Sequence, residues 1–590
     1  MAMGSSTPPV ESAAPAIQAT PNRPRLVWAL LVLVAFFWAC FVGLKQMNLP
    51  IYAGFFSTVG SVALLTLVFT VWWFAAGGGW LRDRALVFVS LIAIVAVFAR
   101  FIDQSIGVMG FIFFGLPVAI SIAVVWLLAT RNRSAAVREL GMLAIFALVG
   151  VFLSFVRGDG IDGEQNAAIR WRWTKSAEEL YLAGRKTNAS APDAKSAVTK
   201  PTLVARPGDW TEFRGENRRG EVHGLKIATD WESHPPKQVW RHRIGPAWSS
   251  MLVIGDRLFT QEQRGEAEVV LCLNASTGEE VWAHQNQTRW YDAQGGAGPR
   301  SSPTYSDGRI YTFGGTGVLN CLEAATGNVC WSRDLIADSG APKPMWGFSS
   351  TPLVVDGVVV VYAGGKGDKG LLAYRDKTGE PAWSVPAGPV SYSSPQVVTV
   401  QGKRQVAFLS DTGLVGVDPP TGKMLWEHKA AAPQIWRVAL PRQIDDAGIV
   451  FGSEDLGLVR IDLAKATPEA KWDSRALRPA YNDFVSQDGY IYGFDEGFFC
   501  CLDAATGKRQ WKGGRYGHGQ ALLLADQHVL LVIGETGEAF LVAARPDRHE
   551  ELGHFQAIEG KTWNHPAIAH GNLYVRNAEE IACYQLPAAK

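Results

Sequence analysis

Eight segments of the chain share a sequence pattern, and each has one residue at the same place in it, just before a short apolar run. The types of these residues suit either ligand binding or the closing of a channel. Aligned on a shared Ser-Ser-Pro-like pattern, these residues are Trp248, Arg300, Ser349, Tyr392, Trp436, Tyr481, His518 and Trp563. Five of the eight are aromatic. A ring of aromatic faces can narrow and seal a channel, or it can bind a planar ligand or a peptide. Both interpretations stay open, and each requires a fold that brings eight distant segments together.

A repeated motif predicts the fold that positions them. The stretch "CLNASTGEEVW" at 272–282 returns as "CLEAATGNVCW" at 321–331 and "CLDAATGKRQW" at 501–511, and weaker copies bring the number to eight. Each unit joins a hairpin around an Asp-Gly-like turn to two strands around the Thr-Gly turn, which makes four strands. Four-stranded antiparallel sheets repeated radially predict an all-β eight-bladed β-propeller, which we place at 206–590.

The ends of the repeat array predict how the ring closes. The last copy, at 581–586, has no turn or tryptophan of its own, whereas Trp240 stands upstream of the first unit. We therefore expect an N-terminal strand around Trp240 to complete the last blade. The repeated tryptophan is expected to fill the wedge between blades, and the Thr-Gly glycine to supply a residue with positive φ.

The N-terminal part of the chain is predicted to be a membrane domain. Hydrocarbon about 30 Å thick requires apolar helices of about 20 residues. Five stretches approach this length, at 26–44, 51–75, 85–102, 105–129 and 139–156. They predict a five-helix transmembrane domain at 25–157, preceded by a disordered cytoplasmic N-terminus at 1–24.

The arginines predict the orientation of this domain. They concentrate before the first span, between the second and third, and between the fourth and fifth, which places these connectors in the cytoplasm. After an odd number of crossings the propeller would lie outside, in the periplasm of a bacterium, with the anchor in the inner membrane. Between the two domains, 158–205 is expected to hold an interfacial helix within 164–182 and then a flexible linker rich in Ala, Pro, Lys and Ser.

The blade pattern also resembles a known family. "LDAxTGxxxW" preceded by "SSPxxxDGxxYxxGxxG" resembles the repeat of the pyrroloquinoline quinone (PQQ)-type propeller family over about 232–586, and "DWTEFRGENRRG" at 209–220 resembles the opening segment of bacterial PQQ-like repeat proteins. One group in this family comprises quinoprotein dehydrogenases, including a membrane glucose dehydrogenase whose propeller follows five transmembrane helices. Another comprises non-catalytic scaffolds such as the outer-membrane assembly lipoprotein. The resemblance implies the fold and leaves the function open.

The dehydrogenase alternative makes specific demands on the ring. The resemblance implies PQQ between aromatic faces, Ca²⁺ held by carboxylate and amide oxygens, and a carboxylate base beside the ion. The cofactor-binding residues would be Trp248, Arg300, Tyr392, Trp436, Tyr481 and Trp563. Asn482, Asp483 and Asn564 would bind calcium, and Asp483 would be the base. The ring lacks a Glu at an equivalent place and the units are compact, which favours the non-catalytic interpretation.

Two long loops share a face with the ring, at 283–302 and 332–350. Their aromatic residues are the predicted partner-binding set: Trp290, Tyr291, Trp346 and Phe348. The alternative is that these aromatics pack the loops onto the propeller. A formal net charge of +1 gives no electrostatic signature for nucleic acid.

Together these patterns favour a membrane-anchored periplasmic scaffold that binds a protein or envelope partner. The alternative function is PQQ-dependent oxidation of a sugar or alcohol, with electrons passed to membrane quinone.

Overall fold

The computed structural model describes residues 26–46, 51–77, 80–163, 167–187, 203–430, 437–465 and 467–589. The chain divides into two compact units. The first comprises Met1–Gly158 with Ile169–Arg172, and the second comprises Asp159–Ala168 with Trp173–Lys590. The predicted N-terminal segment 1–24 lies outside the described residues.

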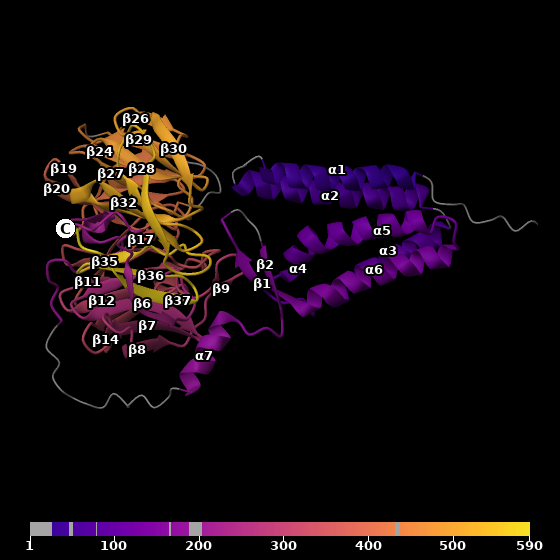
Figure 1. Cartoon of the computed structure of the whole chain (residues 1–590), viewed down its shortest axis with the longest axis horizontal. Coiled ribbons are helices and arrows are strands. Elements are labelled where there is room, and N and C mark those ends of the chain that lie inside the picture. Colours follow the sequence, from indigo (N-terminus) through magenta and orange to yellow (C-terminus); the bar gives the residue numbers. More distant parts are fainter. Residues whose placement is uncertain are drawn as a thin grey trace, which may run out of the picture. The chain divides into compact units, whose positions relative to one another are not determined.

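The first unit is helical, and its long helices run alongside one another (Figure 1). They are α1 (Val27–Gln46), α2 (Ile51–Ala76), α3 (Leu81–Phe98), α4 (Gly107–Gly110), a π-helical turn (Phe111–Gly115), α5 (Leu116–Ala129) and α6 (Ala135–Phe155). Valines, leucines and phenylalanines form a shared apolar core between them. The helices are apolar on all sides, and only one face of each can pack against its neighbours. Many apolar side chains therefore remain on the outer surface, as expected of helices that face lipid.

The predicted number of membrane spans is wrong. Among the described residues, four helical stretches are long and apolar enough to cross a membrane: Val27–Leu44, Phe56–Ala76, Gly107–Ala129 and Ala135–Phe155. The remaining predicted span, 85–102, corresponds to α3, whose first turn contains Arg82, Asp83 and Arg84. These charges belong to the helix rather than to the connector before it, which lowers its suitability for hydrocarbon. The argument from an odd number of crossings therefore no longer supports the periplasmic placement.

The segment after α6 differs from the predicted interfacial helix. A two-stranded sheet pairs β1 (Val156–Ile161) with β2 (Ala167–Trp171), and the helix α7 (Ala177–Thr187) begins only after it. Within the second unit α7 is bound to the propeller, because Tyr181 Oη donates to Glu262 Oε1 at 2.7 Å and Glu178 pairs with Arg289 at 2.8 Å. Residues 188–202 of the predicted linker lie outside the described residues.

The second unit is an eight-bladed β-propeller of four-stranded antiparallel blades, as predicted. Blade 1 comprises β5 (Leu252–Ile254), β6 (Arg257–Arg264), β7 (Ala267–Asn274) and β8 (Glu280–Asn286). Blade 2 comprises β11 (Thr304–Ser306), β12 (Arg309–Phe313), β13 (Val318–Glu323) and β14 (Val329–Asp334), followed by α8 (Leu335–Ser339). Blade 3 comprises β15 (Leu353–Val355), β16 (Val358–Tyr362), β17 (Leu371–Arg375) and β18 (Pro381–Val385). Blade 4 comprises β19 (Gln396–Val400), β20 (Lys403–Ser410), β21 (Gly413–Val417) and β22 (Met424–Lys429).

The second half of the ring continues this pattern. Blade 5 comprises β23 (Arg442–Gln443), β24 (Gly448–Ser453), β25 (Gly457–Asp462) and β26 (Glu469–Ser474). Blade 6 comprises β27 (Val485–Gln487), β28 (Tyr490–Asp495), β29 (Phe498–Asp503) and β30 (Arg509–Arg515). Blade 7 comprises β31 (Gln520–Leu524), β32 (Val529–Ile533), β33 (Glu538–Ala543) and β34 (Glu551–Gln556), with the 3₁₀ turn Ala525–Gln527 between its first two strands. Blade 8 comprises β35 (Ala567–Ala569), β36 (Asn572–Arg576), β37 (Glu580–Gln585) and β4 (Lys237–Arg243).

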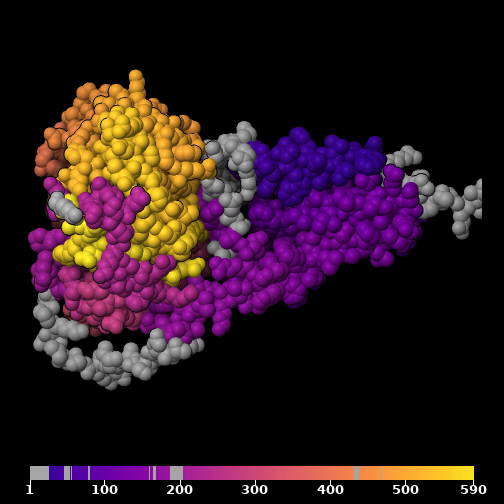
Figure 2. Space-filling view, in the orientation of Figure 1, coloured from indigo at the N-terminus to yellow at the C-terminus, as the bar shows by residue number. Residues whose placement is uncertain are grey.

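The ring closes between the two ends of the propeller sequence. Strand β4 pairs antiparallel with β37, and Trp240 stands opposite Cys583, which confirms the predicted closure. A further segment reinforces blade 7, where β3 (Glu221–Val222) adds a parallel strand to β31 after the 3₁₀ turn Glu216–Arg218. In the space-filling view this magenta segment lies against the yellow C-terminal blades (Figure 2).

In most blades the repeated tryptophan joins its blade to the next; in blade 4, Trp426 Nε1 donates instead to Gln405 Oε1 of the same blade. Trp282 Nε1 of blade 1 donates to Ala324 O in the Thr-Gly turn of blade 2, at 3.1 Å. The glycine of that turn, Gly327, has φ 76°, and a Cβ there would lie 2.6 Å from the Trp282 ring. The same pairing recurs where Trp240 Nε1 donates to Ala275 O at 2.9 Å. Glycine is therefore required in this turn both for its backbone angle and for the approach of the indole.

Candidate functional site at the channel mouth

The first strands of neighbouring blades contact one another around the propeller axis, and the predicted ring residues immediately precede them. Four of these residues meet. The ring centroid of Trp563 lies 4.9 Å from that of Trp248 and 4.8 Å from that of Tyr481. The ring centroids of Tyr481 and His518 are 5.4 Å apart. We call this group the channel-mouth cluster. It combines blades 1, 6, 7 and 8, so only a closed ring can assemble it.

Of the other predicted ring residues, Tyr392 and Ser349 contact each other, and Trp436 lies outside the residues that the structure describes. Tyr392 packs its ring 5.1 Å from Trp346, and its carbonyl accepts from Ser349 Oγ at 3.0 Å. The structure therefore brings four of the eight predicted positions into contact, and a binding role for them stays a prediction.

The Arg300 side chain forms its ion pair and its hydrogen bonds within its own loop. Its guanidinium pairs with the Asp292 carboxylate and donates to Gly296 O at 2.7 Å, within the short sheet of β9 (Tyr291–Asp292) and β10 (Gly296–Ala297). Burial lowers the pKa of Arg300, and Asp292 acts in the opposite direction. Trp248 Nε1 donates to Gly295 O of the same loop at 2.7 Å. The Arg300 side chain thus stabilises the loop beside the channel-mouth cluster.

Two charged residues at the mouth were missed by sequence reasoning. Lys561 Nζ lies 4.5 Å from the Trp563 ring centroid and 5.1 Å from that of Trp248. Burial, together with the charge of Arg300, lowers the pKa of Lys561 to about 8. Glu535, from the turn between β32 and β33, accepts from Trp563 Nε1 at 2.8 Å and from His518 N at 3.1 Å. The available signal for Lys561 was its position two residues before Trp563; Glu535 lies in a degenerate copy and gave none.

The chain's own hairpin contacts this cluster. Lys561 Nζ donates to Ile161 O at 2.9 Å, and Gly163 N donates to Glu535 Oε1 at 2.6 Å. Gly163 is buried, and a Cβ at this position would lie 2.1 Å from His518 Cδ2. We call Ile161–Gly163, which belongs to the same unit as the propeller, the hairpin tip. Backbone groups of the tip thus bind one cation and one anion of the mouth.

The predicted partner-binding residues divide by burial. Trp290 and Phe348 are buried: the Trp290 indole lies against Gly315 and Gly347, and the ring centroid of Phe348 lies 5.1 Å from that of Phe313. Packing therefore explains these two side chains, and they offer no surface to a partner. Tyr291 and Trp346 are partly exposed, and a binding role for them stays a prediction.

The residues proposed for calcium do not fit a calcium site. Arg214 Nη1 lies 2.9 Å from Asp483 Oδ2, and Leu440 N donates to Asp483 Oδ1 at 2.7 Å. A guanidinium in this position repels a divalent cation and neutralises the carboxylate that would act as a base. Asn482 Oδ1 accepts from a backbone amide, and Asn564 Nδ2 donates to Ser249 O. In the described part of the chain no group of three or more His, Cys, Asp or Glu side chains could hold a metal ion.

Comparison with known proteins identifies two kinds of relative. A protein-family model described as outer membrane protein assembly factor BamB matches residues 265–513. Quinohemoprotein alcohol dehydrogenase ADH-IIG of Pseudomonas putida is 28% identical over 367 residues, which cover 56% of this chain and 49% of that protein. BamB of Yersinia pestis is 22% identical over 292 residues, which cover 44% of this chain and 66% of that protein. The chain thus spans about half the length of the first relative and about two thirds of the second.

Solved structures of the same two kinds are similar at low identity. BamB from Moraxella catarrhalis matches with a TM-score of 0.44 and 13% identity, over 60% of this chain and 100% of that chain. Quinohemoprotein alcohol dehydrogenase from Comamonas testosteroni matches with a TM-score of 0.48 and 13% identity, over 65% of this chain and 82% of that chain. Since both kinds of relative match, similarity alone does not choose between a scaffold and a dehydrogenase.

Proposed function

Because the chain carries a PQQ-like β-propeller, we propose that it is a membrane-anchored binding module, in which the propeller holds polypeptide segments and presents a surface to a protein or envelope partner. The apolar helices supply the anchor, and the propeller supplies a rigid scaffold for binding loops. No catalytic step is part of this proposal.

The contact between the hairpin tip and the channel-mouth cluster supports the proposal most directly. Lys561 donates to a backbone carbonyl and Glu535 accepts from a backbone amide. Groups that recognise the main chain suit a polypeptide turn, and the steric fit at Gly163 suits a residue without a side chain. A planar cofactor would need this same space. Together with the ion-paired Asp483, this favours peptide recognition over PQQ binding.

The exposed aromatics next to the mouth are the surface that we assign to an external partner. Trp346 and Tyr291 are partly exposed on loops fixed to the propeller. Aromatic side chains contribute much of the binding energy at interfaces because they bury a large area at a small entropic cost. The test is photo-crosslinking in the native membrane, with a photoreactive phenylalanine at position 346 or 291 of the full chain.

We expect a reproducible crosslinked protein or envelope component from either loop position. A photoreactive residue at Met424, on the exposed outer strand β22, is the matched control and should not give the same product. Equal products from 346 and 424, or none from either loop position, would contradict the assignment. In a separate arm, purified protein receives PQQ and Ca²⁺ and is assayed for dye-linked oxidation of sugars and alcohols; turnover there would favour the dehydrogenase instead.

The periplasmic location is also a proposal, and a cysteine of the propeller can test it. Cys330 is exposed, whereas the other free cysteines of the described residues are buried or half-buried. We expect a membrane-impermeant maleimide to label Cys330 in intact spheroplasts. Four spans return the chain to the side on which it started. Labelling of Cys330 from outside would therefore also place the N-terminus outside. Labelling only after lysis would place the propeller in the cytoplasm.

A further inference from the structure

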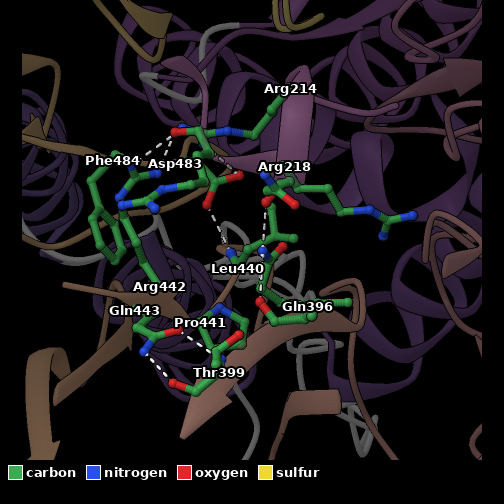
Figure 3. A pocket seen from close by; sticks show the side chains of 13 residues that line it. Arg214, Arg218, Gln396, Thr399, Leu440, Pro441, Arg442, Gln443, Asp483 and Phe484 are labelled. Atoms are coloured by element: carbon green, nitrogen blue, oxygen red, sulfur yellow. Dashed lines mark hydrogen bonds and ion pairs between the residues drawn. The ribbon is translucent and has the colours of Figure 1, made fainter. Parts of the chain in front are cut away.

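A pocket lies next to the segment that leads into the propeller. It has a volume of about 200 Å³ and is lined by this segment and by residues of blades 4, 5 and 6 (Figure 3). Arginine dominates its polar lining: Arg214, Arg218, Arg219 and Arg442. Asp483 is the one acidic side chain among the lining residues of this pocket.

The carboxylates around these arginines are fewer than the guanidinium groups. Asp483 pairs with Arg214 at 2.9 Å, and Glu212 pairs with Arg218 at 3.2 Å. A single carboxylate, Glu221, serves the other two arginines. Its distances are 3.3 Å to Arg219 Nε and 2.6 Å to Arg442 Nη2. The positive charge in excess is therefore located at Arg219 and Arg442.

One of the four arginines has a purely structural role. Arg218 Nη1 donates to Thr351 O at 3.3 Å and to Pro395 O at 3.0 Å, and Arg218 Nη2 donates to Pro352 O. These carbonyls belong to the starts of blades 3 and 4, so Arg218 fastens the N-terminal segment across the inner strands. Its donors are directed at the protein and not at the pocket.

The other two buried arginines differ in how their donors are used. Arg442 donates to Ser486 Oγ, Arg219 O and Glu221 Oε1, so all three of its nitrogens have an acceptor, and it shares its carboxylate with Arg219. The side chains of Arg214 and Arg442 are 1% and 7% exposed. Arg214 Nε is buried and has no hydrogen-bond acceptor among the described residues. Burial lowers the pKa of Arg442 to about 10, and burial with the nearby charge of Arg442 lowers the pKa of Arg214. Buried charge with incomplete compensation is destabilising, and a bound anion would relieve it.

We propose that this arginine pocket binds a small, doubly charged oxyanion of the kind carried by phosphate monoesters and dicarboxylates. Guanidinium groups recognise both through paired N–H donors. Access is provided by the rim, where Arg219 and Thr399 are exposed, while Arg214 and Arg442 form the buried floor. No residue of the channel-mouth cluster or the hairpin tip lines this pocket, so a ligand here does not require the tip to leave the mouth.

The test is isothermal titration of the full chain in detergent, with inorganic phosphate in one arm and succinate in the other, at constant ionic strength. We expect saturable binding at one site per chain. Arg219→Gln removes a half-exposed donor and should weaken binding about tenfold, the equivalent of about 1.4 kcal/mol. Arg475→Gln, at an exposed arginine that does not line the pocket, is the matched control and should bind as the unaltered chain does.

Each outcome decides the proposal. Saturation with phosphate alone identifies a phosphate ester site, and saturation with succinate alone identifies a dicarboxylate site. Absence of saturable binding in both arms would overturn the proposal. Equal weakening by Arg219→Gln and Arg475→Gln would also overturn it, because it would indicate a general charge effect. Arg442→Gln, used only if its thermal unfolding stays cooperative, should weaken binding further than Arg219→Gln.

Discussion

The substitution Gly163→Ala tests whether the hairpin tip is held by the channel-mouth cluster. The added Cβ would lie 2.1 Å from His518 Cδ2 and 2.9 Å from Glu535 Oε1. Both are shorter than van der Waals contact, so the tip must withdraw or the imidazole must move. Withdrawal breaks the 2.6 Å hydrogen bond from Gly163 N to the Glu535 carboxylate. Hydrogen bonds to charged groups contribute about 1.5–3 kcal/mol.

Hydrogen exchange measured by mass spectrometry or NMR reports this loss directly. A loss of about 1.5–3 kcal/mol corresponds to a rise of about 10- to 150-fold in the exchange rate of the residue 163 amide. The amides of β32, in the core of blade 7, should keep their protection. Gly184→Ala in α7 is the matched control, because a Cβ there meets no atom within 4 Å.

Two results would refute this reasoning. Unchanged protection at residue 163 in the Gly163→Ala protein would show that the contact does not hold the tip. Loss of protection throughout blade 7 would show that the substitution unfolds the blade and does not release the tip. Glu535→Gln provides an independent check: it keeps an acceptor of the same shape but removes the charge, and since charged hydrogen bonds are about twice as strong as neutral ones, it should raise the exchange rate less.

Three further changes test the propeller and its mouth. Gly327→Ala combines a positive φ with a Cβ 2.6 Å from the Trp282 ring, and should lower the free energy of unfolding by about 2–4 kcal/mol in chemical denaturation. Trp240→Ala removes the buried indole at the ring closure and should cost about 3–5 kcal/mol, whereas Trp173→Ala, at a side chain 67% exposed, should cost little. Lys561→Met tests the lowered pKa of about 8: between pH 8 and about 10.5 the folded chain loses this proton before the unfolded chain does, so the unaltered protein should gain stability relative to Lys561→Met as the pH rises through this window. A constant difference between the two proteins would contradict the pKa.

The blades could be predicted from the sequence because their determinants are local and repeated. The Thr-Gly turn and its tryptophan belong to one eleven-residue motif, 272–282 in the first copy, and the motif recurs in most of the blades. The closure at Trp240 followed from the missing part of the last copy. The cluster of Trp248, Tyr481, His518 and Trp563 followed in turn, since equivalent positions in a closed ring must face the same axis.

The span count and the linker helix failed because their boundaries depend on more than apolar runs. Helix α3 starts at Leu81 and includes the charges that had been assigned to a connector. In the linker, the amphipathic composition at 164–182 suggested one helix, but β2 pairs with β1 and α7 begins at Ala177. The position of α7 is fixed by ion pairs with the propeller, such as Glu178 with Arg289, which no local pattern can reveal.

The contacts between the hairpin tip and the channel-mouth cluster are of the same non-local kind. Glu535 and Gly163 are separated by 372 residues, and Lys561 and Ile161 by 400. Ile161 and Gly163 lie outside the repeats, so periodicity carries no information about which residues of the blades they contact. The same holds for Asp483, which looked like a calcium ligand from its neighbours in sequence but is paired with Arg214 from the segment before the first blade. Repetition thus specifies where the channel is, whereas the unrepeated segments at its ends specify what occupies it, which is why the hairpin tip and the arginine pocket are the places to test.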